Sequence, residues 1–397
     1  MKIGFDVSQT GRTKAGCGYF ADAMIRALIA SGSGHAFHVY PDFGDFFFDR
    51  EVVDTFTARG ADVRFGPTHL TRESAARFWT APELDAALGY PDIVHANNFW
   101  CPVQSLAGRV IYTLYDLGFL LQPWWTTEEN RLGCMDGVFR AATAADWIVS
   151  ISEASRRDFL ATFPAFPADR IRVIHPCSRF DATDRAGQRP SAVDAAVAGR
   201  FWLNVGTIEP RKNQKRLAEA YARYLADGGE PMPLVLAGGK GWLMDDFRHH
   251  LERLGVAGRI VLTGYVSDDE LVWLYRHCYA NLYPSLFEGF GLPVLEGMQF
   301  GAPTITSASS SIPEVAGDAA ILLDPEDTSA WAAAMLQLSR DPRQREQLGR
   351  QALSRAASFD WMRSSRALLA LYDEAARTPK RHAPACESAS LALPKAA

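Results

Sequence analysis

The sequence has few cysteines and no long apolar run, and both absences narrow the class of protein. Its six cysteines form no Cys-x-x-Cys pair and no metal-ligand spacing, which favours reduced thiols over a disulfide framework. The opening residues, MKIGFDVSQTGR, read as a strand and lack the apolar region of a signal peptide. No apolar run approaches the roughly 20 residues that a membrane-spanning helix needs. We therefore expect a cytoplasmic protein, which leaves peripheral contact with a membrane surface open.

Positive charge is also limited. The chain has 41 Lys and Arg against 46 Asp and Glu, a net charge of −5, which argues against a general nucleic-acid binder. The remaining composition is that of a globular protein, with 48% hydrophobic and 22% charged residues. Because 397 residues exceed one ordinary hydrophobic core, two domains are expected.

Short strand-like runs alternate with helical patterns along most of the chain. The first series is KIGFDVS, FHVY, DIVHA, RVIYTLYD, DWIVSIS and IRVIHP; a second, beyond residue 200, is FWLNVG, PLVLAGG, RIVLTG, YANLYPS and APTITS. This alternation predicts parallel sheets with helices on both faces. Ser152 is predicted as the N-cap of the helix after DWIVSIS, and His95, at the end of DIVHA, is assigned a structural role.

The two series predict an α/β chain of two facing, Rossmann-like, doubly wound domains. We place the first domain at residues 1–178, a polar linker rich in small residues at 179–199, and the second domain at 200–358. Residues 378–397 are rich in Pro, Ala and Ser and are predicted to be disordered. Since ligands of such sheets bind beyond the carboxyl ends of the strands, a cleft between the domains is the expected site.

The segment SLFEGFGLPVLEGMQFGAP places two glutamates around a glycine-containing turn between a strand and a helix. Glycines there let backbone N–H groups approach a ligand, and the start of a helix favours an anion. Glu288 lies just outside the helix and Glu296 about one turn inside it, roughly 6 Å along the axis. Carboxylates accept hydrogen bonds from vicinal hydroxyls, so we expect a ligand with hydroxyls at both ends and an anion between them, such as a nucleotide sugar. The alternative is a helix-capping Glu288 and a solvent-exposed Glu296.

A source of positive charge for a diphosphate lies upstream, in LNVGTIEPRKNQKRLAEAY. This segment reads as strand, turn and helix, and its turn carries Arg211 and Lys212. A guanidinium offers a planar fork to paired phosphate oxygens and an ammonium a compact charge. Together they can stabilise the charge that grows on a departing diphosphate. The alternative is that Arg211 and Lys212 are ordinary exposed residues at the start of a helix. Positive charge at that position is unfavourable with the helix dipole, so an anionic partner is favoured.

Together these motifs resemble the family 4 retaining glycosyltransferases, which have the GT-B fold. The chain carries the Glu-x7-Glu pattern of that family as Glu288 and Glu296, its phosphate-binding turn as VGTIEPRKN, and its N-terminal blocks as YTLYDLGFL and VSISEASRRDF. The likeness runs from the first strand to about Trp361. The block SFDWMRSSRALLALYDEA resembles the last helix of the family, and implies that residues 359–377 pack back on the first domain.

The resemblance implies roles for individual residues. Glu296 would bind the donor ribose, Glu288 the donor sugar, and the cation pair Arg211 and Lys212 the diphosphate. The implied catalytic residues are Asp116, Tyr115, Glu288, Arg211 and Lys212, and the implied donor-binding residues are Gly16, Gly18, Gly206, Arg211, Lys212, Glu288, Gly289, Phe290, Gly291, Leu292 and Glu296. For Gly16 and Gly18 a simple turn is an equal alternative.

One position departs from the family pattern, because Tyr115-Asp116 stands where the family has His-Asp. A phenol cannot hold a proton near neutral pH as imidazole does. We predict that Tyr115 contacts the C6 end of the donor sugar, and we favour GDP-mannose or a nucleotide-linked 6-deoxyhexose such as rhamnose. The chain has no Asp-x-Asp sequence, which is consistent with a metal-independent reaction without a cofactor. Retention of anomeric configuration is implied by the resemblance alone.

The acceptor is encoded less clearly than the donor. The family resemblance implies a saccharide or a lipid-linked glycan, in polysaccharide or O-antigen synthesis at the inner face of a bacterial membrane. A sugar-nucleotide 2-epimerase shares the two-domain architecture, and a non-catalytic sugar-nucleotide-binding subunit would also fit an altered Tyr115. Turnover of donor with acceptor, and the mass of the product, separate the three functions.

Overall fold

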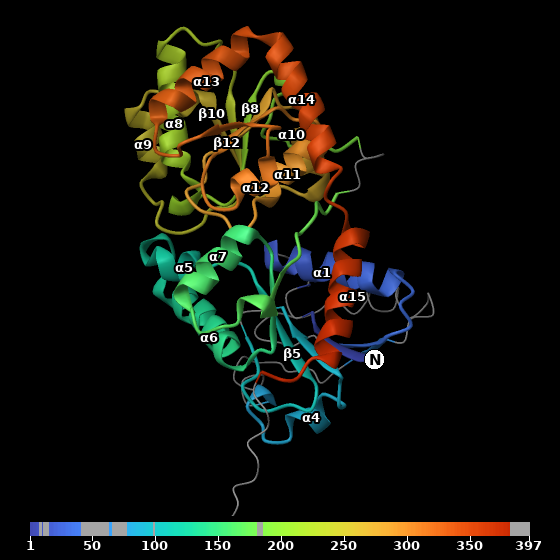
Figure 1. Ribbon diagram of the computed structural model, residues 1–397. Helices are drawn as coiled ribbons and strands as arrows, with labels where there is room; N and C mark the ends of the chain where they lie inside the picture. Colours follow the sequence, from blue (N-terminus) through green and yellow to red (C-terminus); the bar gives the residue numbers. More distant parts are fainter. Residues whose placement is uncertain are drawn as a thin grey trace, which may run out of the picture.

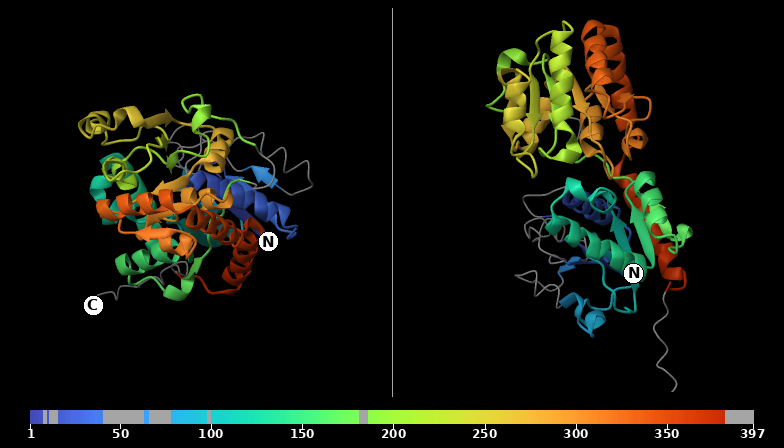
Figure 2. Two further views of the ribbon diagram at one scale, coloured as in Figure 1. Left: turned by 90° about the horizontal axis from the view of Figure 1, so that it is seen from above. Right: turned by 90° about the vertical axis from the view of Figure 1, so that its left-hand side faces the viewer.

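The computed structural model describes residues 1–7, 10, 16–40, 63–65, 78–97, 100–180 and 186–381, and in it two parallel sheets form two stacked domains (Figures 1 and 2). The first sheet has the order β3-β2-β1-β4-β5-β6-β7, and the second has the order β10-β9-β8-β11-β12-β13. Strand order reverses at the β1–β4 pair in one sheet and at the β8–β11 pair in the other. The predicted doubly wound α/β class is confirmed.

The N-terminal domain contains the strands β1 (Lys2–Asp6), β2 (Ala36–Tyr40), β3 (Val63–Phe65), β4 (Ile93–Ala96), β5 (Arg109–Leu114), β6 (Trp147–Ser150) and β7 (Ile171–Val173). Its helices are α1 (Gly16–Ala30), α4 (Leu84–Ala87), α5 (Gly118–Leu121), α6 (Glu128–Ala144) and α7 (Glu153–Thr162), with 3-10 turns at Pro123–Trp125 and Ala168–Arg170. Ser152 caps α7, as predicted, because its hydroxyl accepts the N–H of Ser155 at 3.0 Å.

The C-terminal domain contains the strands β8 (Trp202–Val205), β9 (Leu234–Ala237), β10 (Ile260–Gly264), β11 (Ala280–Tyr283), β12 (Thr304–Ser307) and β13 (Ile321–Leu323). Its helices are α8 (Gln214–Ala226), α9 (Phe247–Arg253), α10 (Asp268–His277), α11 (Leu292–Gln299), α12 (Ile312–Ala316), α13 (Thr328–Arg340) and α14 (Pro342–Ala356), with 3-10 turns at Ala195–Val197, Pro210–Lys212 and Ala257–Arg259. The strands β8, β9, β11 and β12 are buried along their length, as helices on both faces of a parallel sheet require.

Helix α15 (Trp361–Arg377) returns to the N-terminal domain and packs along α1 (Figure 1). Its Tyr372 is buried, and the hydroxyl lies 2.6 Å from Nδ1 of His95, whose Nε2 lies 2.8 Å from the Thr113 hydroxyl. The predicted structural role of His95 is confirmed, because both of its ring nitrogens bind side chains inside the core. One continuous apolar cluster joins β1, α1 and α15 to α11 and α12 of the other domain.

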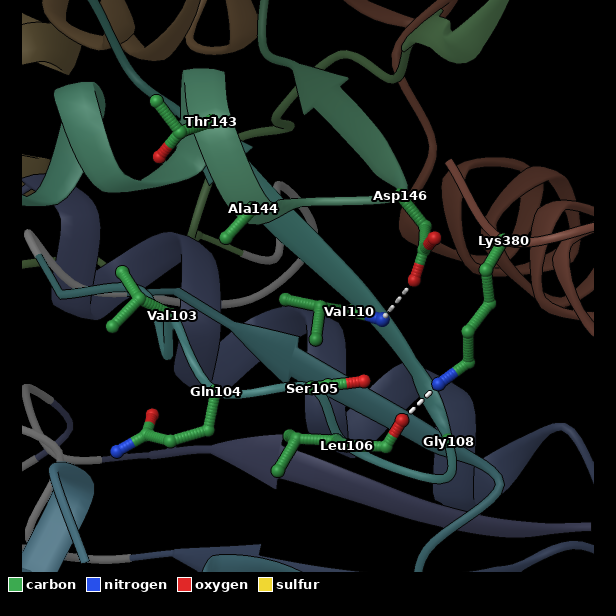
Figure 3. A pocket seen from close by; sticks show the side chains of 10 residues that line it. All are labelled: Val103, Gln104, Ser105, Leu106, Gly108, Val110, Thr143, Ala144, Asp146 and Lys380. Atoms are coloured by element: carbon green, nitrogen blue, oxygen red, sulfur yellow. Dashed lines mark hydrogen bonds between the residues drawn. The ribbon is translucent and has the colours of Figure 1, made fainter. Parts of the chain in front are cut away.

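The residues after α15 run past the amino-terminal end of β5 in the N-terminal sheet. The guanidinium of Arg109 donates to the Thr378 carbonyl, and Lys380 donates to the Leu106 carbonyl. Lys380 and Asp146 border a cavity of about 200 Å³ there (Figure 3). Because β5 begins here, the cavity lies at the opposite end of the sheet from the carboxyl ends of the strands, where ligands are expected. The predicted disordered tail falls, from residue 382 onward, outside the described residues.

Among the described residues, no helix combines the length and apolar composition needed to cross a bilayer.

Candidate active site

The predicted site residues follow strands at the switch point of the C-terminal sheet. Gly206, Arg211 and Lys212 follow β8, and the turn of residues 285–291 follows the adjacent β11. In α/β sheets this is the place where ligands bind. Tyr115 and Asp116, which follow β5 of the other domain, face this turn, and a Cβ added to Gly289 would lie 2.5 Å from the Tyr115 carbonyl oxygen and 3.1 Å from Oδ2 of Asp116. Residue 289 must therefore be glycine for the domains to approach this closely.

The carboxylate of Glu288 is the centre of a buried polar cluster. Its Oε1 accepts from Nζ of Lys212 at 2.7 Å, from the Tyr283 hydroxyl at 2.9 Å and from the Ser285 hydroxyl at 2.5 Å. Its Oε2 lies 2.8 Å from Nη1 of Arg211. The side chain is only 9% exposed, so the cluster holds this carboxylate inside the protein and away from bulk water.

Electrostatics in this cluster favour the charged carboxylate. Burial alone raises the pKa of Glu288, but the opposite charges of Arg211 and Lys212 outweigh it and bring the pKa to about 2. Burial lowers the pKa of Lys212, and Glu288 partly restores it. Glu209 pairs with Nη2 of Arg211 at 2.8 Å, so two acids and two bases lie together.

The local backbone conformation positions the side chains of Arg211 and Lys212. Asn213 has a left-handed conformation, φ 62°, and its amide donates to the carbonyls of Pro284 and Pro325 at 3.1 and 2.7 Å. The backbone carbonyl of Arg211 accepts the N–H of Leu286 at 2.8 Å, and the guanidinium of Arg211 donates to the Phe287 carbonyl at 2.9 Å. The basic turn after β8 is thereby fastened to the turn after β11.

Asp116 adds a third acid, which is half-buried and is contributed by the N-terminal domain. Its Oδ1 accepts the N–H of Gly118 at 2.8 Å. Burial raises the pKa of Asp116, while Arg211 acts in the opposite direction. The structure thus brings together Asp116, Glu288 and the cation pair from segments far apart in the sequence.

Tyr115 lies beside this group but is directed into its own domain. Its hydroxyl donates to the Cys17 carbonyl at 3.2 Å, and its ring meets Phe20 edge-on at 5.9 Å. The phenol thus supports the start of α1. The predicted contact with the donor sugar stays a prediction.

The start of α11 follows directly on the cluster. Gly291 has φ 108°, a value that favours glycine, and it precedes Leu292 and Pro293 in the first turn. Phe290 is buried against the rings of His175 and Phe359, at 5.7 and 5.8 Å.

Two serines hold the same turn from the α12 side. The Ser310 hydroxyl accepts the N–H of Glu288 at 2.7 Å, and the Ser311 hydroxyl lies 2.8 Å from the Glu288 carbonyl. Neither serine was predicted from the sequence.

Glu296 forms a second acidic site one turn into α11. Its Oε2 accepts from the Tyr275 hydroxyl at 3.2 Å, and its Oε1 lies 3.3 Å from Nε of Arg179. Burial raises its pKa to about 7, although Arg179 acts against this shift. The Arg179 guanidinium also lies 4.1 Å from the centre of the Tyr19 ring. The two glutamates are therefore both buried, each beside a cation, which contradicts the alternative of a solvent-exposed Glu296.

Two family models match the chain. Residues 15–177 match the model described as Glycosyltransferase Family 4, and residues 194–355 match Glycosyl transferases group 1. The O-antigen chain mannosyltransferase B of Escherichia coli is 33% identical over 272 residues, which cover 68% of this chain and 71% of that protein. The chain belongs to the family 4 glycosyltransferases. It is therefore a hexosyltransferase, as its motifs predict.

Two further likenesses extend over most of this glycosyltransferase. The serotype-specific mannosyltransferase WbdA of Escherichia coli is 27% identical over 401 residues, which cover 91% of this chain. The match spans 46% of WbdA, so the chain corresponds to about half of that relative. The crystal structure of Anabaena Alr3699/HepE in complex with UDP-glucose superposes with a TM-score of 0.67 at 17% identity, covering 94% of this chain and 100% of that one. The predicted GT-B fold is confirmed.

Arg179 is a further residue of this glycosyltransferase site that sequence reasoning missed. It lies at the first position of the predicted linker, where an arginine reads as surface charge, and its partner Glu296 is far along the chain. The signal available was an arginine six residues beyond the end of β7, the last strand of the first domain.

The two glycines predicted in the loop before α1 differ in their surroundings. Gly16 is exposed, and a Cβ there would meet nothing within 4 Å, whereas Gly18 is buried in α1. Within the described ranges, no three His, Cys, Asp or Glu side chains gather as a metal site. Donor binding by these glycines and independence of metal both stay predictions.

Proposed function

We propose that this family 4 glycosyltransferase transfers mannose from a nucleotide diphosphate sugar, GDP-mannose in the first instance, to a saccharide acceptor in O-antigen assembly. The names of the Escherichia coli relatives support mannose over the alternative 6-deoxyhexose. One observation carries the proposal. Asp116, Glu288, Arg211 and Lys212 meet at the switch point, where the two domains face each other.

The cation pair is the part of the proposed mechanism that binds the diphosphate. Arg211 and Lys212 are already held side by side, since both contact Glu288. A diphosphate placed against them would share their charge with Glu288. When the bond between sugar and phosphate breaks, negative charge on the leaving group increases, and the two fixed cations stabilise it without having to reorganise.

The glutamates would orient the two ends of the donor. Glu288 stays ionised at neutral pH because its pKa is about 2, so its carboxylate remains an acceptor for sugar hydroxyls. Hydroxyls of Tyr283 and Ser285 fix its orientation. Glu296 lies one turn into α11 and would accept from the ribose hydroxyls, with Arg179 balancing its charge.

The proposal includes a metal-independent reaction that retains anomeric configuration, in which the leaving phosphate helps to deprotonate the acceptor. The charge of Arg211 and Lys212 supports the first part, because it can replace a divalent cation at the leaving group. Activity that survives an excess of EDTA, with an α-linked product by NMR, is the expected result.

A donor screen tests the proposal. The chain is incubated with GDP-mannose, dTDP-rhamnose or UDP-glucose and an α-linked mannotriose, and products are identified by mass. We expect one hexose to be added from GDP-mannose. Turnover of UDP-glucose alone would refute the donor assignment, and a change of donor mass or configuration without transfer would indicate an epimerase.

The proposal also includes a cytoplasmic location and peripheral contact with the inner face of the membrane. Flotation with vesicles that contain anionic lipid measures that contact.

A further inference from the structure

A carboxylate from one domain binds the start of a helix in the other domain. Glu314, on α12 of the C-terminal domain, accepts the N–H of Glu153 through both oxygens, at 2.9 and 3.0 Å, and that of Ala154 at 3.4 Å. Both N–H groups belong to the first turn of α7, where a helix has free donors and a partial positive charge. His175, in the segment after β7, adds a contact of 2.7 Å between its Nε2 and Oε1 of Glu314.

The backbone of Glu314 is held from its own domain. Its carbonyl and that of Val315 accept from the guanidinium of Arg355 on α14, at 2.5 and 2.9 Å. The side chain is 19% exposed. Burial raises the pKa of Glu314, yet His175 and the α7 N–H groups lower it below its usual value. The carboxylate is therefore charged and directed at α7 under ordinary conditions.

The same turn of α7 contacts the reacting centre. The Ser155 hydroxyl donates to the Tyr115 carbonyl at 2.8 Å and lies 3.4 Å from the Gly289 carbonyl. Tyr115 precedes Asp116, and Gly289 follows Glu288. A shift of α7 relative to α12 would therefore move Asp116 relative to Glu288. The close approach at Gly289 leaves little room for an alternative alignment.

We propose that Glu314 is a positioning residue of the transfer reaction: by binding the start of α7 and His175, it holds the two domains in the alignment that places Asp116 against Glu288. The expected effect on turnover rests on the proposed function, whereas the expected effect on the alignment of the domains does not. The residues that we assign to the diphosphate all lie in the C-terminal domain. Loss of the contact should therefore reduce turnover without reducing affinity for the nucleotide.

The test compares Glu314→Gln with Glu153→Gln in the full chain. Each variant loses one carboxylate near the start of α7, but the Glu153 side chain pairs with Arg156 on its own helix and does not cross between domains. For Glu314→Gln we expect kcat with GDP-mannose and mannotriose to fall about 3- to 30-fold, the range for a carboxylate at a helix start. The Kd for GDP should change less than twofold. Glu314→Asp, which keeps the charge, should recover part of the loss.

Hydrogen exchange supplies a readout that does not depend on activity. In Glu314→Gln, the amides of Glu153 and Ala154 should exchange faster, whereas the amide of Phe163, bonded to the Phe159 carbonyl in the last turn of α7, should be unchanged. Glu153→Gln should leave all three amides protected.

Unchanged kcat in Glu314→Gln would overturn the proposal, and so would reduced kcat with unchanged exchange at Glu153 and Ala154. If the parent protein transferred no sugar, the proposed function would fail, and the exchange measurement would still decide whether Glu314 holds the domains.

Discussion

Replacing Glu288 with Gln should destabilise the C-terminal domain, because it leaves two partly buried cations facing a neutral amide. The pKa of Glu288 falls from 4.5 to about 2 in the folded protein. At about 1.4 kcal/mol per pH unit, this corresponds to about 3 kcal/mol of stability at neutral pH. In a domain of this size each kcal/mol shifts Tm by roughly 2–4 °C, so we expect a decrease of roughly 6–12 °C.

Calorimetric unfolding of Glu288→Gln measures this decrease. The matched control is Glu346→Gln, which removes an exposed carboxylate paired with Arg350 on α14; such surface pairs contribute at most about 1 kcal/mol. Because the folded pKa is depressed, the stabilisation is complete above pH 4.5 and is lost as pH falls towards 2. The difference from the parent protein should therefore shrink over that window. A decrease no larger than that of the control would refute the assigned role of the cluster.

Three further predictions concern binding and turnover. Lys212→Ala should weaken GDP binding about 10- to 100-fold by calorimetric titration, since a charge-assisted contact is lost; unchanged affinity would remove Lys212 from the diphosphate site. The pKa of Glu296 is raised to about 7, so its ionised form becomes dominant above neutral pH. GDP affinity should accordingly rise about tenfold between pH 6 and 8 if the carboxylate binds ribose, and an equal rise in Glu296→Gln would show that another group titrates. Gly289→Ala places a methyl group 2.5 Å from the Tyr115 carbonyl, so kcat should fall about 5- to 100-fold with GDP affinity preserved, and normal kcat would contradict close contact during turnover.

The sequence predicted those parts of the fold and site whose signals are local. Every strand of the two predicted series was found, including the three-residue β7, whereas β3 and β13, which also have three residues each, were missed. Glu288, Arg211 and Lys212 were found because each lies in a short turn between a strand and a helix, and Glu296 because it lies about one turn into the helix that follows.

Contacts between segments that are distant along the chain could not be predicted from the sequence. The pairing of Lys212 with Glu288 depends on β8 lying next to β11, which no local pattern encodes. Arg179 and Glu314 looked like ordinary surface residues, because their partners come from other elements. The direction of the Tyr115 side chain also depends on packing, since its hydroxyl finds the Cys17 carbonyl in α1.

The return of α15 to α1 has a consequence for how the chain is made. The second domain consists of one continuous stretch and can close as soon as the ribosome releases α14. The first domain has to wait, because the helix that covers α1 and supplies Tyr372 to His95 is synthesised after the second domain. During translation the N-terminal domain is thus completed after the C-terminal one, and the apolar side chains of α1 that pack on α15 stay uncovered in the meantime.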